Sequence, residues 1–166
     1  MFSPAPTFHQ RDGRIAFTQG DRFEIELRAP DGRPRMIVRR ATASRLVSAA
    51  EFERAVDSWV SPLPPDLRRQ LLPRLREAST SRVRPPISGV WLAGDGRIWA
   101  TFGEPAIGEP VQASVFDSLG RWESDVTLPD GIQINQIDSD GLLGTFKDED
   151  GFRHLRFYRF RRWPRV

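Results

Sequence analysis

One short sequence motif, called a phrase below, recurs along this chain. "RDGRIAFTQ" at residues 11–19 recurs as "GDGRIWATF" at 94–102, and "DSDGLLGTF" at 138–146 follows the same plan. Each phrase places an Asp-Gly or a similar glycine turn beside an apolar run, and glycine tolerates the positive φ that a tight hairpin turn requires. The interval between the second and third phrases is about half the interval between the first and second. The chain is therefore expected to build repeated β-hairpins, with a different kind of segment filling the long first interval.

Alternation of apolar and polar residues predicts the strands themselves. Single strands are expected at 22–27, 35–40, 133–137, 141–146 and 153–160. "GVWLAGDGRIWATF" and "QASVFDSLGRWESDVTL" each predict two further strands around a glycine turn. Repeats of four short antiparallel strands, about 40–45 residues long, are typical of propeller blades. The prediction is a single all-β, propeller-like domain over 1–166 with blades at 7–40 and 86–128 and an incomplete blade at 132–162; a two-layer sandwich is the alternative.

The long interval predicts a helical insertion at 46–80. Ser48 and Glu51 form a capping-box pattern at the start of a first helix. After this start, apolar residues recur on one face of the first helix: Phe52, Ala55, Val56, Trp59 and Val60. A second helix is expected to follow, with its own apolar face: Leu67, Leu71, Leu72 and Leu75. Pro73 is expected to bend or split the second helix. Both helices are expected to lie on the β-sheet body.

Composition bounds the class of protein. A chain of 166 residues with 39% hydrophobic and 28% charged residues is typical of a folded domain. The chain has no cysteine and only two histidines, which excludes disulfides, thiolate metal sites and a histidine-rich metal centre. No cofactor and no membrane partner are expected, and a cytoplasmic location is expected if Met1 is the native start. The large aromatics are assigned to the core: Trp59, Trp91, Trp99 and Trp122.

Positive charge is concentrated at one end. The net charge is +3, but residues 151–166 carry six arginines and no acid, so the remainder is net acidic. The candidate interaction residues are Arg153, Arg156, Arg159, Arg161, Arg162 and Trp163. Arginine interleaved with aromatic residues suits nucleic acid, through phosphate pairing and base stacking. The same pattern also suits a final strand whose arginine stems cover aromatic rings. Nucleic-acid binding is kept as an alternative and is not the expected function.

Candidate chemical sites are few. Asn135, Asp138 and His154 are the catalytic candidates, and Asp138 with Asp140 is the metal candidate. The acidic turns lack the ligand spacing of a calcium loop, which places a glycine at its sixth position. No glycine elbow, phosphate loop or nucleotide fingerprint accompanies these residues. Solvated turn residues and structural roles are favoured, and the sequence leaves open whether the protein is an enzyme.

Three stretches of the sequence resemble parts of a known family of proteins. "GVWLAGDGRIWATF", "VFDSLGRWESDVTLP" and "GLLGTFKDEDGFRHLRFYRFRR" resemble the last blades of bacterial six-bladed β-propellers of the NHL/TolB-like kind. Three blades are half of such a propeller, and half a propeller would expose apolar outer faces. The expected function is a binding or assembly module with an unknown ligand, and a homodimer that closes six blades is favoured. A fragment of a longer propeller and an open three-blade stack capped by its helices are the alternatives. A hydrolase or lyase, lactonase-like, with its site in the propeller channel is the alternative that some relatives of this kind suggest.

Overall fold

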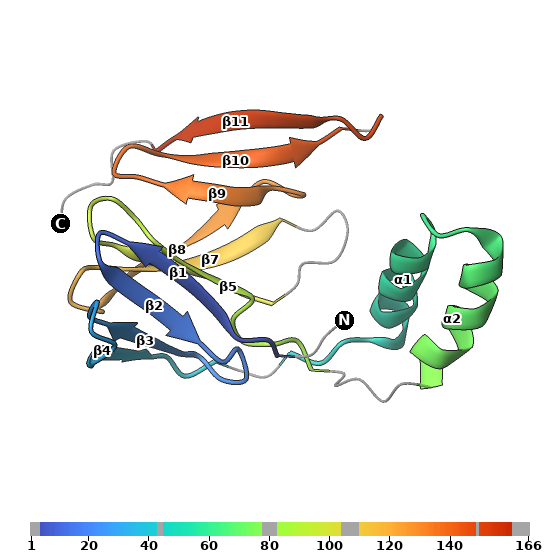
Figure 1. Ribbon diagram of the computed structural model, residues 1–166, viewed down its shortest axis with the longest axis horizontal. Helices are drawn as coiled ribbons and strands as arrows, with labels where there is room; N and C mark the ends of the chain where they lie inside the picture. The colour runs from blue at the N-terminus through green and yellow to red at the C-terminus, as the bar shows by residue number, and fades with distance from the viewer. Residues whose placement is uncertain (1–3, 43–44, 78–82, 104–109, 149, 161–166) are drawn as a thin grey trace.

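The computed structural model describes residues 4–42, 45–77, 83–103, 110–148 and 150–160. It contains three antiparallel sheets and two helices (Figure 1). The prediction of a mostly β protein with a helical insertion is confirmed. The sheets fall within the segments 7–40, 86–128 and 132–162, and both helices fall within 46–80.

The first sheet is a four-stranded meander in chain order. Its strands are β1 Thr7–Arg11, β2 Arg14–Thr18, β3 Glu24–Arg28 and β4 Pro34–Arg39. The repeated Asp-Gly forms the β1–β2 turn, where Asp12 has φ 49° and Gly13 has φ 71°. Aspartate is among the few residues besides glycine that enter this left-handed region readily. The repeated phrase is therefore a hairpin signal, as the sequence predicts.

The second sheet repeats this plan and the third repeats three quarters of it. The second sheet runs in chain order through β5 Gly89–Leu92, β6 Ile98–Thr101, β7 Val111–Phe116 and β8 Trp122–Leu128. The third has the order β11–β10–β9, from β9 Gln133–Ile137, β10 Gly141–Lys147 and β11 Arg153–Arg159. Its third strand, β11, is an edge strand. The corresponding strands of the other two sheets, β3 and β7, each have a fourth strand beside them.

The three sheets are stacked, with the second in the middle (Figure 1). One apolar core lies between the first and second sheets and includes Ile25, Leu92 and Phe116. Another lies between the second and third sheets and includes Val115 and Leu142. The first strand of the second sheet, β5, contacts the first strands of both other sheets, β1 and β9. Both faces of the second sheet are therefore covered, whereas the first and third sheets each have one covered face.

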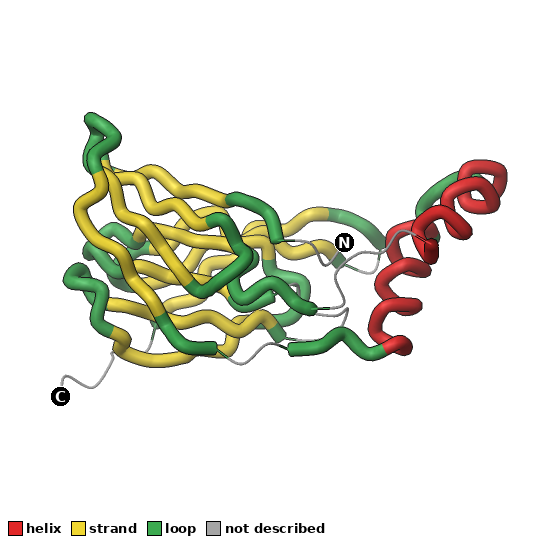
Figure 2. Tube along the Cα trace, turned by 90° about the horizontal axis from the view of Figure 1, so that it is seen from below, coloured by secondary structure: helices red, strands yellow, loops and turns green. Residues whose placement is uncertain are grey.

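The helices α1 Ala49–Val60 and α2 Pro65–Glu77 pack against each other. They lie beside the stack of sheets, on one side of it (Figures 1 and 2). Their shared core comprises Val47, Phe52 and Val56, with Leu72 and Leu75 against it. The expectation that the helices lie on the sheets is wrong, because the apolar stripe of each helix is covered mainly by that of the other.

Pro73 lies inside α2, which continues through it to Glu77. The expected split of this helix at proline is therefore wrong. The proline side chain is exposed, so water can hydrogen-bond the carbonyl that loses its N–H partner.

The start of α1 is fixed by the predicted capping box. Ser48 Oγ accepts a hydrogen bond from the Glu51 N–H, and the Glu51 carboxylate accepts one from the Ser48 N–H at 2.8 Å. Arg84, on the segment returning to the sheets, donates to Glu51 Oε1 at 2.7 Å. The hydrogen bond from the Ser48 backbone, followed by that from Arg84, lowers the pKa of Glu51 to about 2. One carboxylate therefore caps the helix and joins the two connections to the sheets.

The tryptophan prediction is half right. Trp99 is buried and stacks on Phe160 with ring centroids 5.2 Å apart, and Trp91 packs partly buried against the same core. Trp59 on α1 and Trp122 at the start of β8 are exposed instead. Trp122 lies on the edge strand β8, where the Arg40 guanidinium is 5.6 Å from its ring centroid and the side chain is otherwise open to solvent.

Candidate binding surfaces

The three catalytic candidates lie in separate environments. Asn135 on β9 accepts a hydrogen bond from Thr145 Oγ1 at 2.8 Å. His154 on β11 places Nε2 2.5 Å from Asp148 Oδ2 at the β10–β11 hairpin, and this hydrogen bond is the main reason that the pKa of Asp148 is lowered. Asp138 is paired with an arginine of the first sheet. Among the described residues, no hydrogen bond joins any two of these three candidates, so the fold does not assemble them into one catalytic group.

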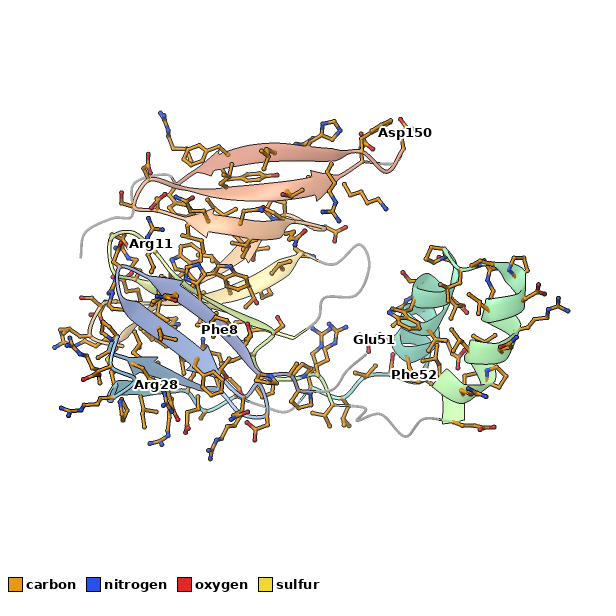
Figure 3. All side chains as sticks on the ribbon, in the orientation of Figure 1. Phe8, Arg11, Arg28, Glu51, Phe52 and Asp150 are labelled. Carbon is orange, nitrogen blue, oxygen red and sulfur yellow. The ribbon has the colours of Figure 1, made fainter. Side chains whose placement is uncertain are left out.

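Asp138 belongs to a clamp between the first and third sheets. Arg11, at the end of β1, donates to the Ile137 carbonyl at 2.7 Å and forms an ion pair with Asp138 Oδ1. Figure 3 shows Arg11 at the end of β1 nearest the third sheet. Gly94 leaves room for the clamp, because a Cβ there would lie 2.5 Å from Asp138 Oδ1 and 2.8 Å from the Arg11 guanidinium. The other Asp138 oxygen accepts a hydrogen bond from Gln136.

The metal candidates do not form a ligand set. Asp138 is engaged by Arg11, and Asp140 is exposed in the turn before β10, where its carbonyl accepts the Phe160 N–H at 2.9 Å. Within the described part of the chain, no group of three or more histidine, cysteine, aspartate or glutamate side chains is placed to hold a metal ion. Asp138 is therefore better explained as a structural ion-pair partner.

His9 also has a structural partner. Its Nδ1 lies 3.1 Å from the Leu92 nitrogen and accepts that backbone hydrogen bond, which joins β1 to β5. Burial, and then the nearby Arg11 charge, lowers the pKa of His9. Both effects favour the neutral imidazole that an acceptor requires.

A second clamp joins the first and second sheets at their periphery. Arg40, just after β4, donates to both Asp125 oxygens at 2.6 and 2.9 Å and also to Ser114 Oγ. Its guanidinium lies 5.7 Å from the Phe102 ring centroid and 5.6 Å from that of Trp122, within cation–π range. Hydrogen bonding, chiefly from Arg40, lowers the pKa of Asp125 to about 2.

The outer face of the first sheet exposes apolar side chains on either side of a charged strand, since Glu26 of β3 lies between them and pairs with Arg28. Phe8 pairs with Phe17, Phe17 with Glu26, and Glu26 with Ile37 across the four strands. Phe8 is 70% exposed and Ile37 is 44% exposed. Residues of the alternate row, such as Ala16, are buried in the first core. The outer face of the first sheet therefore leaves Phe8 and Ile37 open to solvent at one end of the stack, and Figure 3 labels Phe8.

The outer face of the third sheet is open in the same way. Leu155 and Phe157 on β11 are 70% and 52% exposed, and they pair with Thr145 and Leu143 on β10. The Phe157 ring lies across Gly141, where a Cβ would be 2.2 Å from the ring. Strand alternation could have identified this surface, because Leu155 and Phe157 alternate with Arg156 and Tyr158.

The arginine-rich end is only partly within the described residues. Arg153, Arg156 and Arg159 lie on β11, whereas Arg161, Arg162 and Trp163 lie outside the described residues. Arg156 lies 4.9 Å above the Phe146 ring centroid. Of the described acidic residues, none forms an ion pair with the three arginines of β11. These three cations are therefore open to a partner of opposite charge.

Arg11 and Arg40 were not singled out from the sequence. Each has its acidic partner far along the chain, so local spacing gave no signal for either clamp. Comparison of the chain with models of known families, with curated proteins and with solved structures gave no match. Among the described residues, neither helix has the length and apolar character needed to cross a membrane.

Proposed function

We propose that this chain is a binding and assembly module that pairs with a second copy into a closed, six-bladed propeller-like body. The observation that carries the proposal is that both end faces of the stack are uncovered and expose large apolar side chains. The second sheet buries both faces, but the first sheet exposes Phe8 and Ile37, and the third exposes Leu155 and Phe157. Large apolar side chains exposed together on an uncovered sheet face mark a candidate interaction surface.

The arrangement of strands supports blades in preference to a two-layer sandwich. Each sheet is built from strands consecutive in the chain, and the first strands of the sheets contact each other in the order β1, β5, β9. Later strands lie toward the periphery, where Arg40 clamps neighbouring sheets. A two-layer sandwich would instead consist of only two sheets, with strands exchanged between them. The resemblance to NHL/TolB-like propellers is consistent with this arrangement.

Closure would bring the first sheet of one copy against the third sheet of the other. A two-fold axis would repeat this contact, so a dimer would contain two equal sheet-to-sheet interfaces. Stable interfaces bury about 1,600 Å² in total, and apolar area contributes about 25 cal/mol per Å². The working surface would be formed by the loops around the axis, where several blades meet.

Light scattering across a range of concentrations tests this proposal. The wild-type chain is expected at about twice its 18.9 kDa mass. Ile37→Ser and Leu155→Ser should each shift the protein toward monomer, since symmetry makes each change affect both interfaces. Trp59→Ser is the matched control, because Trp59 is equally exposed but lies on the helical hairpin. A monomeric wild-type chain, or equal effects from all three changes, would contradict the proposal.

A further inference from the structure

The free edge of β11 has no strand paired to it in the described part of the chain. The first and second sheets have four strands each, whereas the third ends at this third strand. All β11 side chains except Tyr158 are exposed. An open edge presents unpaired N–H and C=O groups, which pair readily with an extended segment. The third sheet therefore has the backbone groups for one more strand.

The charges along β11 restrict what can occupy that place. Arg153 and Arg159 lie on the outer face with Leu155 and Phe157, and Arg156 lies on the opposite face. The β11 strand itself contains no acidic residue. Cross-strand neighbours interact directly, and like charges opposite each other are destabilising. An added strand should therefore carry acidic residues opposite the three arginines and apolar residues opposite Leu155 and Phe157.

These charges disfavour the β11 edge of a second copy as the occupant. In the antiparallel register that pairs all seven residues of two β11 strands, Arg153 would face Arg159 and Arg156 would face Arg156. Three like-charge pairs would result, which is a common way for edge strands to avoid self-association. A nucleic-acid strand would satisfy the arginines but could not form the strand ladder.

We infer that the edge of β11 binds an extended acidic peptide segment of another protein by adding it as the fourth strand of the third sheet. The pattern for a seven-residue ligand is acidic residues at positions one, four and seven and apolar residues at positions three and five. This pattern is the same in both chain directions. The inference goes beyond the proposed dimer and does not depend on it, because it uses a sheet edge and the dimer uses sheet faces.

The test measures fluorescence anisotropy of a labelled peptide, Glu-Thr-Val-Glu-Val-Thr-Glu, at low salt. The full chain should bind it and should not bind the same peptide with lysine in place of glutamate. A version methylated on alternate backbone nitrogens keeps all charges but cannot form the strand ladder, and it should not bind. Equal binding of the methylated peptide would overturn the inference, since charge alone would then explain the affinity.

Reversing the charges on the protein provides a second test of the inference. The triple change R153E/R156E/R159E should weaken binding of the glutamate peptide by about tenfold or more, and it should create binding of the lysine peptide. That gain also shows that the variant is folded. R54E/R69E/R74E, on the helical hairpin, makes the same charge change and should leave glutamate-peptide binding intact. The inference would be overturned if both triple variants lost binding of the glutamate peptide and R153E/R156E/R159E did not gain binding of the lysine peptide.

Two other occupants give distinct results. Tighter binding of a single-stranded oligonucleotide that displaces the peptide would assign the arginines to nucleic acid and overturn the inference. Loss of dimer mass on R156E alone would assign this edge to a second copy and overturn the inference, because Arg156 lies off the outer face that the proposed dimer uses. Failure of the proposed dimer is measured separately by Ile37→Ser, on a sheet that the peptide does not contact, and leaves the peptide result unaffected.

Discussion

Asp125→Asn should destabilise the stack by removing the charge from the clamp between the first and second sheets. The substitution keeps the shape of the side chain but replaces the carboxylate that accepts two hydrogen bonds from Arg40. Ser114 Oγ and Trp122 Nε1 also donate to Asp125 Oδ1, at 2.6 and 3.2 Å. The change therefore tests the one carboxylate on which these contacts converge.

The expected size follows from the lowered pKa of Asp125. A fall from 3.8 to about 2 corresponds to about 2.5 kcal/mol. The side chains of Arg40 and Asp125 are 31% and 40% exposed, so solvent screening reduces the expected contribution substantially. We expect Asp125→Asn to lower the free energy of unfolding by about 1 kcal/mol at neutral pH.

The pH dependence has a definite sign. Because the folded protein lowers this pKa, the stabilisation is present above the ordinary pKa of about 4 and is lost as pH falls through about 2. The difference between wild type and Asp125→Asn should therefore be constant from pH 7 to pH 5 and should shrink between pH 4 and pH 2.

Urea unfolding followed by tryptophan fluorescence measures this difference, and a double-mutant cycle with Arg40→Gln isolates the pair. Asp66→Asn is the control, since Asp66 and Arg69 form an ion pair with side chains 81% and 80% exposed. That change should alter stability by less than about 0.5 kcal/mol. A difference for Asp125→Asn that persists unchanged at pH 2, or that does not exceed the control, would refute the reasoning.

Two further perturbations test the core and the helical hairpin. Phe116→Ala should cost about 3–5 kcal/mol, because Phe116 is 2% exposed in the first core, with its ring 5.8 Å from that of Phe23; a loss below about 1 kcal/mol in urea unfolding would contradict this packing. Glu51→Gln should speed amide hydrogen exchange in α1 without affecting exchange in β6, since Glu51 caps the helix and the helices pack on each other. Equal acceleration in α1 and β6 would show that the hairpin and the sheets unfold as one unit.

The strands could be predicted from the sequence because their signals are local. Asp-Gly turns and alternating apolar residues mark hairpins within a few residues, and the capping box at Ser48 and Glu51 marks one helix start. The position of the helices could not be predicted in this way. An amphipathic stripe shows that a helix face is covered, but it does not show whether a sheet or another helix covers it.

The two clamps, Arg11 with Asp138 and Arg40 with Asp125, could not be predicted from local sequence patterns for a similar reason. Arg11 and Asp138 are 127 residues apart, and Arg40 and Asp125 are 85 apart. In a chain with 25 arginines and lysines and 22 acids, many such pairs are conceivable. Asp138 was noticed as an acid in a turn, but only the stacking of the sheets identifies Arg11 as its partner. The outer face of the third sheet carried a local signal, since alternation places Leu155 and Phe157 on one face of β11 and Arg156 and Tyr158 on the other.

The central claim is that the first sheet of one copy meets the third sheet of another, and cross-linking tests it most directly. The natural chain has no cysteine, so I37C and L155C each introduce a single thiol. A short thiol-specific cross-linker should join an I37C chain to an L155C chain when the two variants are mixed, and it should join neither variant to itself. Cross-linking within each variant alone, or none in the mixture, would contradict the proposed closure.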